Sequence, residues 1–387
     1  MQIIFIVSII IVLYTYLGYG VLLYIIVLLK RIFIKHQDKQ FSFDDLPSCT
    51  VIVAAFNEAG FIEDKIKDTL GLSYPLNRLK IVFVTDGSTD ETPQIVSRYP
   101  QITLLHKDER KGKIAAVHRA MLEASTEVVV FTDANTFLHS ESLIQLCKHY
   151  ADKKVGGVAG EKKIFVDKLA DATAGEGFYW KYESKLKSLD SEFYSVVGAA
   201  GELYSIRCSL YTPVPIDSIL DDFMISMGIA ERGYKIKYEP QAYAQETSSA
   251  NIQEEMKRKI RIAAGAFQSI IWLKSLLNPF KLPILTFQYL SHRVLRWTIA
   301  PLALVFVYIA NVYLAIINTN DYGFFLFLQS VFYVMAFLGS WMESKKVRLK
   351  ILFIPYYFCL MNYAVLAGGL RFFFGHQSVM WEKAKRK

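Results

Sequence analysis

Apolar runs long enough to cross a membrane lie at both ends of the chain, and a more polar region separates them. Residues 3–29 are almost wholly apolar and include no charged side chain. A helix of about 20 such residues spans the hydrocarbon core of a bilayer. Residues 297–317, 322–341 and 351–370 are further runs of this kind. The pattern predicts a retained amino-terminal anchor and a carboxy-terminal group of transmembrane helices.

Short apolar runs and amphipathic segments alternate in the polar region. We expect strands at residues 50–56, 79–84, 102–106 and 127–132, and helices at 58–70, from 92 onward and at 113–124. This alternation is typical of a mostly parallel sheet covered by helices on both faces. Further strands are predicted at 155–166 and 193–204, and a helix at 221–232 that ends at Gly233.

Two basic amphipathic segments, 251–277 and 281–292, follow this region. We expect them to lie in the membrane interface, although an ordinary surface helix has the same pattern. The predicted organisation is therefore a transmembrane anchor (1–30), an α/β domain (48–250), interface helices (251–295), transmembrane helices (296–374) and a basic tail (375–387).

Composition and charge support a membrane protein rather than a nucleic-acid-binding one. The 387 residues are 53% hydrophobic, and the mean hydropathy is +0.26. The net charge of +8 comes from Lys and Arg beside the apolar runs, which suits the anionic cytoplasmic face of a membrane. The four cysteines have no metal or disulfide spacing, so a reducing compartment is the simplest inference. We expect a multi-pass cell-membrane protein with a cytoplasmic α/β domain and no nucleic-acid partner.

The expected topology contains a conflict at the carboxyl terminus. If residues 30–31 are cytoplasmic, three further complete spans would place the tail outside. The basic residues between 383 and 387 favour the cytoplasm instead. Gly368, Gly369 and Arg371 would allow the last apolar segment to be tilted or re-entrant against other helices. We predict a cytoplasmic tail.

Acidic and amide side chains stand where several predicted elements begin or end. The ends of strands in open α/β sheets are where such folds bind nucleotides, and the glycine after Asp86 would let the backbone approach a ligand closely. A basic segment, residues 110–113, lies between two of these positions. The positions are Asn57 with Glu58, Asp86, Asp133 with Asn135, and Asp221 with Asp222.

These residue types suit transfer from an activated diphosphate donor. A leaving diphosphate needs a divalent cation or Lys and Arg, and an attacking hydroxyl needs a carboxylate base. Asp133 and Asn135 would point the same way in an extended chain and offer oxygen ligands to a hard cation. Each position alone also fits an ordinary turn or helix start. The hypothesis therefore rests on their joint order.

That order resembles the family 2 glycosyltransferases with the GT-A fold, including membrane-embedded polysaccharide synthases. The resemblance rests on residues 53–58, 86–90, 111–113, 133–135, 198–202 and 220–222. It implies a Rossmann-like GT-A domain and a nucleotide-diphospho-sugar donor, with a UDP-sugar favoured. It also implies an inverting reaction, a glycan or lipid-linked acceptor, and a role in polysaccharide biosynthesis.

The resemblance also implies roles for particular residues. Asp222 corresponds to the catalytic base, and Mg²⁺ or Mn²⁺ is the implied cofactor. The implied nucleotide-binding residues are Asn57, Glu58, Asp86, Lys113 and Asp133; the metal ligands are Asp133 and Asn135; the acceptor or diphosphate residues are Gly201, Glu202, Asp221, Arg258 and Arg261.

Two departures from the family pattern keep alternatives open. Asn135 replaces an acidic metal ligand, and residues 258–262 lack the tryptophan of the synthase motif QxxRW. Trp297 could substitute for it, but its place at the start of an apolar run predicts membrane anchoring. The alternatives are transfer of a single sugar to a lipid phosphate, or a catalytically weak nucleotide-binding subunit of a synthase complex. Partner subunits and a homo-oligomer both remain compatible with the sequence.

Overall fold

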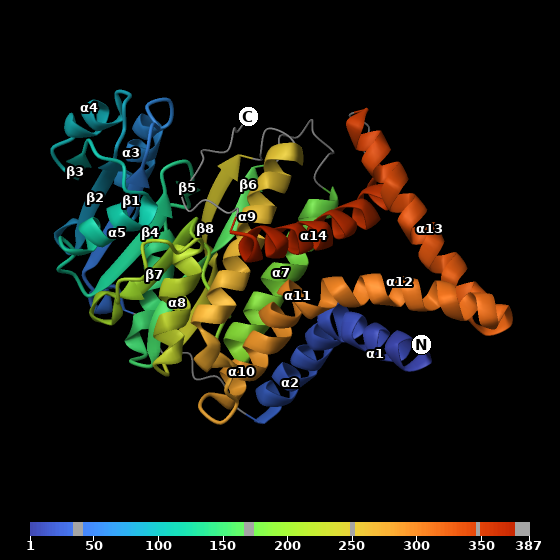
Figure 1. Ribbon diagram of the computed structural model, residues 1–387. Helices are drawn as coiled ribbons and strands as arrows, with labels where there is room; N and C mark the ends of the chain where they lie inside the picture. Colours follow the sequence, from blue (N-terminus) through green and yellow to red (C-terminus); the bar gives the residue numbers. More distant parts are fainter. Residues whose placement is uncertain (34–41, 166–173, 248–251, 346–348, 376–387) are drawn as a thin grey trace.

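The computed structural model describes residues 1–33, 42–165, 174–247, 252–345 and 349–375 (Figure 1). A mixed, mostly parallel sheet of eight strands forms the centre of the α/β domain, in the order β3-β2-β1-β4-β7-β6-β8-β5. The strands are β1 (Cys49–Ala55), β2 (Leu79–Asp86), β3 (Thr103–Lys107), β4 (Val128–Asp133), β5 (Phe137–Leu138), β6 (Val155–Phe165), β7 (Leu203–Arg207) and β8 (Lys235–Thr247).

The predicted parallel half of the sheet is confirmed. Val51 of β1 lies between Ile81 of β2 and Val130 of β4, and all three strands run in the same direction. Helices cover both faces of these strands, which explains why their sequences are almost continuously apolar. The carboxyl ends of β1, β2 and β4 therefore meet at one edge of the sheet. The residues that follow these strands are brought together there.

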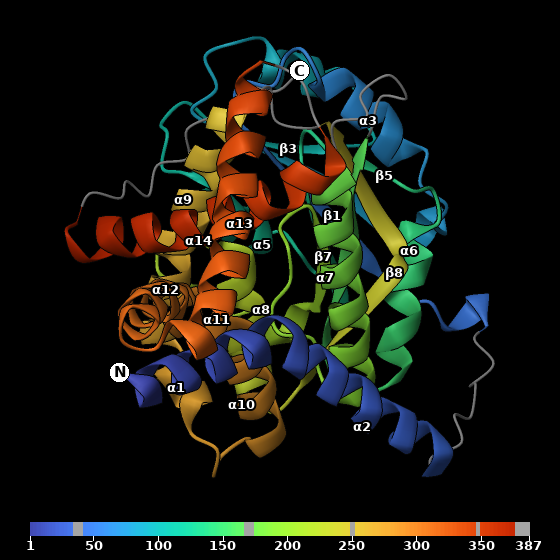
Figure 2. The same cartoon turned by 90° about the vertical axis from the view of Figure 1, so that its right-hand side faces the viewer.

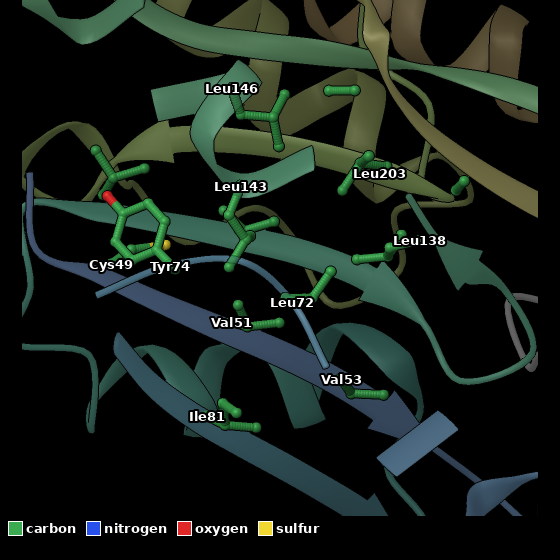
Figure 3. Close-up of a cluster of buried hydrophobic side chains, with 14 of the residues drawn as sticks. Cys49, Val51, Val53, Leu72, Tyr74, Ile81, Leu138, Leu143, Leu146 and Leu203 are labelled. Atoms are coloured by element: carbon green, nitrogen blue, oxygen red, sulfur yellow. The ribbon is translucent and has the colours of Figure 1, made fainter. Parts of the chain in front are cut away.

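Two hydrophobic layers hold the helices against the sheet. Figure 3 shows one of them, in which Leu143 and Leu146 gather with Val51 and Val53 of β1. The second layer lies on the opposite face and includes Phe223. The helices of the domain are α3 (Ile62–Leu70), α4 (Thr92–Ser97), α5 (Lys113–Met121), α6 (Ser142–Cys147), α7 (Ala174–Phe193) and α8 (Asp221–Glu231).

The flanking regions are helical. Within the described residues, four stretches are long and apolar enough to cross a membrane: Gln2–Phe33, Ile299–Ile317, Asp321–Glu343 and Lys350–Phe373. They agree with the four predicted apolar segments and indicate a membrane protein. The elements are α1 (Gln2–Leu13), α2 (Tyr19–Phe33), α9 (Ile252–Trp272), α10 (Pro283–Tyr289), α11 (Leu295–Trp297), α12 (Ile299–Ile317), α13 (Thr319–Ser344) and α14 (Lys350–Phe373).

The amino-terminal segment has two differently placed halves. A π-helical turn, Tyr14–Gly18, separates α1 from α2. Helix α1 packs along α12, whereas α2 packs along α7 of the α/β domain (Figures 1 and 2). Tyr19 and Leu23 are buried against Leu186, and Lys30 donates to the carbonyl oxygen of Glu192 at 2.6 Å. The second half of the predicted anchor is therefore attached to the domain.

The last apolar helix, α14, lies across α9 (Figure 1). A Cβ atom at Gly368 would lie only 2.5 Å from the Cβ of Ala263. A glycine at this position is therefore required for the two helices to approach so closely. Helix α14 contacts α7 as well, so it forms part of the wall of the domain.

The predicted strand at 193–204 is wrong. Helix α7 continues to Phe193, and β7 begins only at Leu203. Val196 and Val197 are buried in the connecting segment, so their apolar character reflects burial and not strand pairing. Helix α7 and strands β5 and β8 are elements that the sequence pattern did not predict. Residues 36–41 between the predicted anchor and the α/β domain, Val166 of a predicted strand, and the tail residues 376–387 lie outside the described residues.

Candidate active site

Two adjoining cavities open where the strands of the parallel half end. The larger has a volume of about 470 Å³ and lies between α5, α7, α8, α9 and α14. The smaller lies at the ends of β1 and β2 and is lined by Phe56, Asp86 and Arg110. Gly112, Lys113 and Asp133 line both cavities. The two spaces therefore meet at a basic and an acidic side chain.

Lys113 and Asp133 form an ion pair at this junction. Lys113 opens α5 after Gly112, which has a positive φ of 96°, and its Nζ lies 2.7 Å from Oδ1 of Asp133. Burial opposes the lysine charge, but Asp133, Asp221 and Asp222 outweigh it and raise the pKa of Lys113. The lysine therefore stays cationic at neutral pH.

Asp222 faces this pair from the first turn of α8. A Cβ atom on Gly201 would lie 3.3 Å from both Nζ of Lys113 and Oδ2 of Asp222, so the glycine leaves space between them. Oδ1 of Asp222 accepts a hydrogen bond from the backbone N–H of Phe223 at 2.8 Å. Burial, with the charge of Asp221, raises the pKa of Asp222 to about 7. A carboxylate tuned in this way is an effective base near neutral pH.

A buried ionic network forms one wall of the larger cavity. Nζ of Lys162 lies 2.6 Å from Glu202, and Nη2 of Arg258 lies 3.0 Å from the same carboxylate. Glu246 pairs with both cations. Burial opposes the charge of Glu202, but Lys162 and Arg258 outweigh it and lower its pKa. The network therefore connects β6, β8 and α9 with Glu202, the residue that precedes β7.

Arg261 lies about one turn after Arg258 and also lines the larger cavity. Within the described part of the chain, its guanidinium makes no hydrogen bond or ion pair. Burial lowers the pKa of Arg261, and the nearby Asp221 opposes this effect. A forked donor in this position can bind a diphosphate.

Asp86 holds the basic loop 110–113. Its Oδ2 accepts from the backbone N–H groups of Lys111 at 2.8 Å and Gly112 at 2.6 Å, and Arg119 donates to Oδ1 at 3.3 Å. A Cβ atom on Gly87 would lie 2.4 Å from the Cβ of Arg110, so the loop requires glycine there. Asp86 thus positions the start of α5, and with it Lys113.

Three residues expected at the site lie beside it. Oδ1 of Asn57 accepts from the backbone N–H of Thr89 at 2.8 Å. The backbone N–H of the buried Glu58 donates to Oγ1 of Thr92 at 2.9 Å. These two residues hold the loop after β2 and, like Asn135, are not among the residues that line the two cavities.

Sequence reasoning missed two contacts between side chains at the site. The Arg110 guanidinium lies 3.7 Å from the centre of the Phe56 ring, an aromatic and cationic pair suited to a nucleotide base. Trp297 lines the larger cavity and packs edge-on against Phe223 at 5.3 Å, whereas its position in the sequence predicted anchoring. No local spacing connects these residues, because each pair is separated by more than 50 positions.

One comparison concerns the α/β domain. Residues 50–211 match the family model described as glycosyl transferase family 2. The match begins in β1 and ends shortly after β7, so it lies within the region that carries the mixed sheet. These residues therefore form a family 2 glycosyltransferase domain.

Individual relatives have low sequence identity to this chain. The poly-beta-1,6-N-acetyl-D-glucosamine synthase of Staphylococcus aureus strain MSSA476 is 24% identical over 241 residues, covering 59% of this chain. The chain spans 57% of the length of that relative. The synthase of the same name from Staphylococcus epidermidis is 23% identical over 304 residues, covering 74% of this chain and 70% of the relative.

A solved structure is similar over nearly the whole chain. The mannosyltransferase PcManGT from Pyrobaculum calidifontis, in complex with GDP-Man and Mn²⁺, has a TM-score of 0.74 and 23% sequence identity. The match covers 97% of this chain and all of that one. The likeness shows that the α/β domain and its helical flanks share one overall fold with that protein.

Proposed function

We propose that the protein is a membrane-bound inverting glycosyltransferase that moves a sugar from a nucleotide-diphospho-sugar to a glycan or lipid-linked acceptor in polysaccharide biosynthesis. The observation that carries this proposal is the meeting of Lys113, Asp133 and Asp222 around Gly201. The Staphylococcus relatives support a role in polysaccharide synthesis. A UDP-sugar is the proposed donor.

The proposed reaction assigns each cavity a part. The nucleotide lies in the smaller cavity beside Phe56 and Arg110, and the diphosphate extends to the junction. Asp222 accepts the proton of the acceptor hydroxyl, which attacks the anomeric carbon as the bond to the diphosphate breaks. Lys113 and Arg261 stabilise the negative charge that grows on the departing diphosphate.

The residues at the junction also fit a divalent cation in part. Among the described residues, no group of three or more His, Cys, Asp or Glu side chains could hold a metal by itself. Asp133 supplies one hard oxygen ligand, so the donor diphosphate would have to supply others. We propose Mg²⁺ or Mn²⁺ held by Asp133 and the donor, with Asn135 behind Asp133. The ion would supply Lewis-acid stabilisation of the leaving group.

We expect activity to require a divalent cation. Excess chelator should reduce transfer by about 100-fold, because the diphosphate would lose its principal countercharge. Asn135→Asp should retain activity and lower the Mn²⁺ concentration needed for half-maximal rate. Titration of nucleoside diphosphate release with Mg²⁺ and Mn²⁺ measures both effects. Full activity in chelator would assign the role of the metal to Lys113 and Arg261.

The pH profile should show the titration of Asp222. Because its pKa is raised to about 7 and only the ionised form accepts a proton, kcat/KM should fall as pH decreases below this value. The expected slope is about ten-fold per pH unit on the acid side, with a level region above about pH 7. Initial rates across this range at subsaturating donor test the assignment. A rate that rises as the solution is made more acidic would contradict it.

Membrane placement is part of the proposal. We propose a multi-pass protein of the cell membrane with the glycosyltransferase domain in the cytoplasm. The proposed domain boundaries are those predicted from the sequence. Met361, Ala364 and Val365 of α14 line the larger cavity, so this helix cannot lie wholly within the hydrocarbon core while Asp222 works in water. This contact supports a tilted or re-entrant α14 and a cytoplasmic tail.

The acceptor could also be a lipid phosphate that receives a single sugar. The contact of α14 with the cavity favours an acceptor that arrives from the membrane. Incubating the purified full chain with UDP-sugars and GDP-sugars, and measuring nucleoside diphosphate release, tests the proposed function. Turnover of one donor is expected. Nucleotide binding with no turnover of any donor would instead indicate a non-catalytic partner subunit.

A further inference from the structure

The larger cavity extends beyond the residues that it shares with the smaller one. Gly112, Lys113 and Asp133 mark its nucleotide side, because these residues also line the smaller cavity. Lys187 of α7, Trp297 of α11 and residues of α14 line the larger cavity and not the smaller one. This part of the larger cavity is therefore available to an acceptor that reaches Asp222.

Lys187 is the unusual residue there. Its side chain is buried, with 8% of the residue exposed. Its Nζ lies 5.7 Å from the centre of the Tyr238 ring. Within the described residues, it makes no hydrogen bond and has no carboxylate oxygen within ion-pair distance.

Two acidic side chains lie near Lys187 without bonding to it. Glu183, one turn earlier on α7, pairs with Arg293 at 2.9 Å and Arg296 at 2.8 Å. Oε1 of Glu161 accepts a hydrogen bond from Ser184 at 2.6 Å, and its Oε2 has no hydrogen-bond partner. Burial raises the pKa of Glu161 and the charge of Lys187 opposes this effect, so Glu161 acts on the lysine only from beyond ion-pair distance.

Lys187 is mostly buried but lines the cavity, and its ammonium group loses part of its hydration without hydrogen bonds that replace it. A protein can retain such a group where a ligand supplies the missing anion. Lys187 and Asp222 both line the larger cavity, so an anion bound by Lys187 would lie in the same space as Asp222.

The surroundings indicate where that anion comes from. Met361, Ala364 and Val365 belong to a helix that is long and apolar enough to span a membrane. Trp297 packs against Phe223, the residue next to Asp222. An indole ring is a suitable surface for a sugar ring, because both present apolar C–H or ring faces. A lipid-borne group would thus pass α14 and Trp297 before it reaches the base.

We propose that the part of the larger cavity lined by Lys187, Trp297 and α14 is an acceptor subsite for a phosphate-bearing, lipid-linked sugar. In this arrangement Lys187 binds the acceptor phosphate, Trp297 packs against the acceptor sugar, and the accepting hydroxyl points to Asp222. The inference rests on the proposed function and specifies its acceptor. A soluble sugar phosphate offers the same anion, so the test must separate the two sources.

The test uses the full chain purified in a neutral maltoside detergent. Calorimetric titrations with dodecyl phosphate and with glucose 1-phosphate compare a lipid-borne and a soluble phosphate. The variant is Lys187→Met, and the matched control is Lys185→Met, an exposed lysine on the same helix. UDP and GDP titrations report the donor site separately, and the Tm of each variant reports folding.

Lys187→Met should weaken dodecyl phosphate binding by about ten-fold or more, because a charge-assisted hydrogen bond is lost. Lys185→Met should leave it unchanged, and nucleotide binding should survive in both variants. The Tm of Lys187→Met should stay close to that of the wild type, because the substitution removes no hydrogen bond or ion pair within the described residues.

Other results would overturn the inference. Equal dodecyl phosphate affinity in Lys187→Met and the wild type would exclude the subsite. If the wild type binds glucose 1-phosphate as tightly as dodecyl phosphate, a lipid source is excluded. A lower Tm with loss of nucleotide binding would show a structural role for Lys187. Failure of the wild type to bind any nucleotide would contradict the proposed function itself, whatever the phosphate result.

Discussion

Asp222→Asn should abolish sugar transfer while nucleotide binding survives. The amide keeps the shape of the side chain and its place at the start of α8, but it cannot accept the acceptor proton. Loss of a general base costs about 100-fold or more in turnover. Nucleoside diphosphate release at saturating donor measures this loss, and calorimetric titration with the nucleoside diphosphate measures retained binding.

The matched control is Asp64→Asn, which makes the same change at an exposed position on α3. It should have near-normal activity. Turnover of Asp222→Asn within a few-fold of wild type would remove Asp222 from the mechanism. Loss of nucleotide binding in the same variant would show that the carboxylate supports the donor site and not only the chemistry.

Asp86→Ala should weaken donor binding by about 10-fold to 100-fold, because each of the charge-assisted hydrogen bonds that it removes contributes about 1.5–3 kcal/mol. The variant frees the backbone amides of Lys111 and Gly112 and the guanidinium of Arg119. The loop that presents Lys113 to the junction would then lose its fixed conformation. Titration with UDP and GDP measures the loss.

Asp108→Ala is the control for this prediction. Asp108 lies in the connection between β3 and α5, which also contains Lys111 and Gly112. Its side chain is fully exposed apart from a contact with His106. It should leave nucleotide affinity unchanged. If Asp86→Ala also leaves affinity unchanged, the hydrogen bonds of Asp86 are not needed for the donor site.

The parallel half of the fold could be predicted from the sequence because burial acts on each strand locally. Val51, Ile81 and Val130 lie within continuous apolar runs, and a strand covered on both faces requires such a run. The residues after those strands could then be assigned to one edge of the sheet. That is why Asp86 and Asp133 could be selected in advance, whereas Lys113 and Asp222 were selected from the resemblance to family 2 glycosyltransferases.

The parts of the fold and of the candidate site that the sequence did not predict depend on contacts between distant segments. Helix α7 was missed because its sequence has only a weak apolar stripe and includes Gly175 and Gly177, which lower helix propensity. Trp297 sits in an apolar run that fits a membrane boundary equally well. Only the packing of α11 on Phe223 brings it into the cavity. The pairing of Lys162 with Glu202 likewise connects β6 with the residue before β7, which no local pattern links.

The anomeric configuration of the transferred sugar tests the central claim most directly. Asp222 is proposed as a base for one in-line attack, and this single displacement inverts the anomeric centre. With the donor identified by turnover, nuclear magnetic resonance of the first product should show the configuration opposite to that of the donor. Retention of configuration, or release of nucleoside diphosphate that is equal in the wild type and Asp222→Asn, would contradict the account.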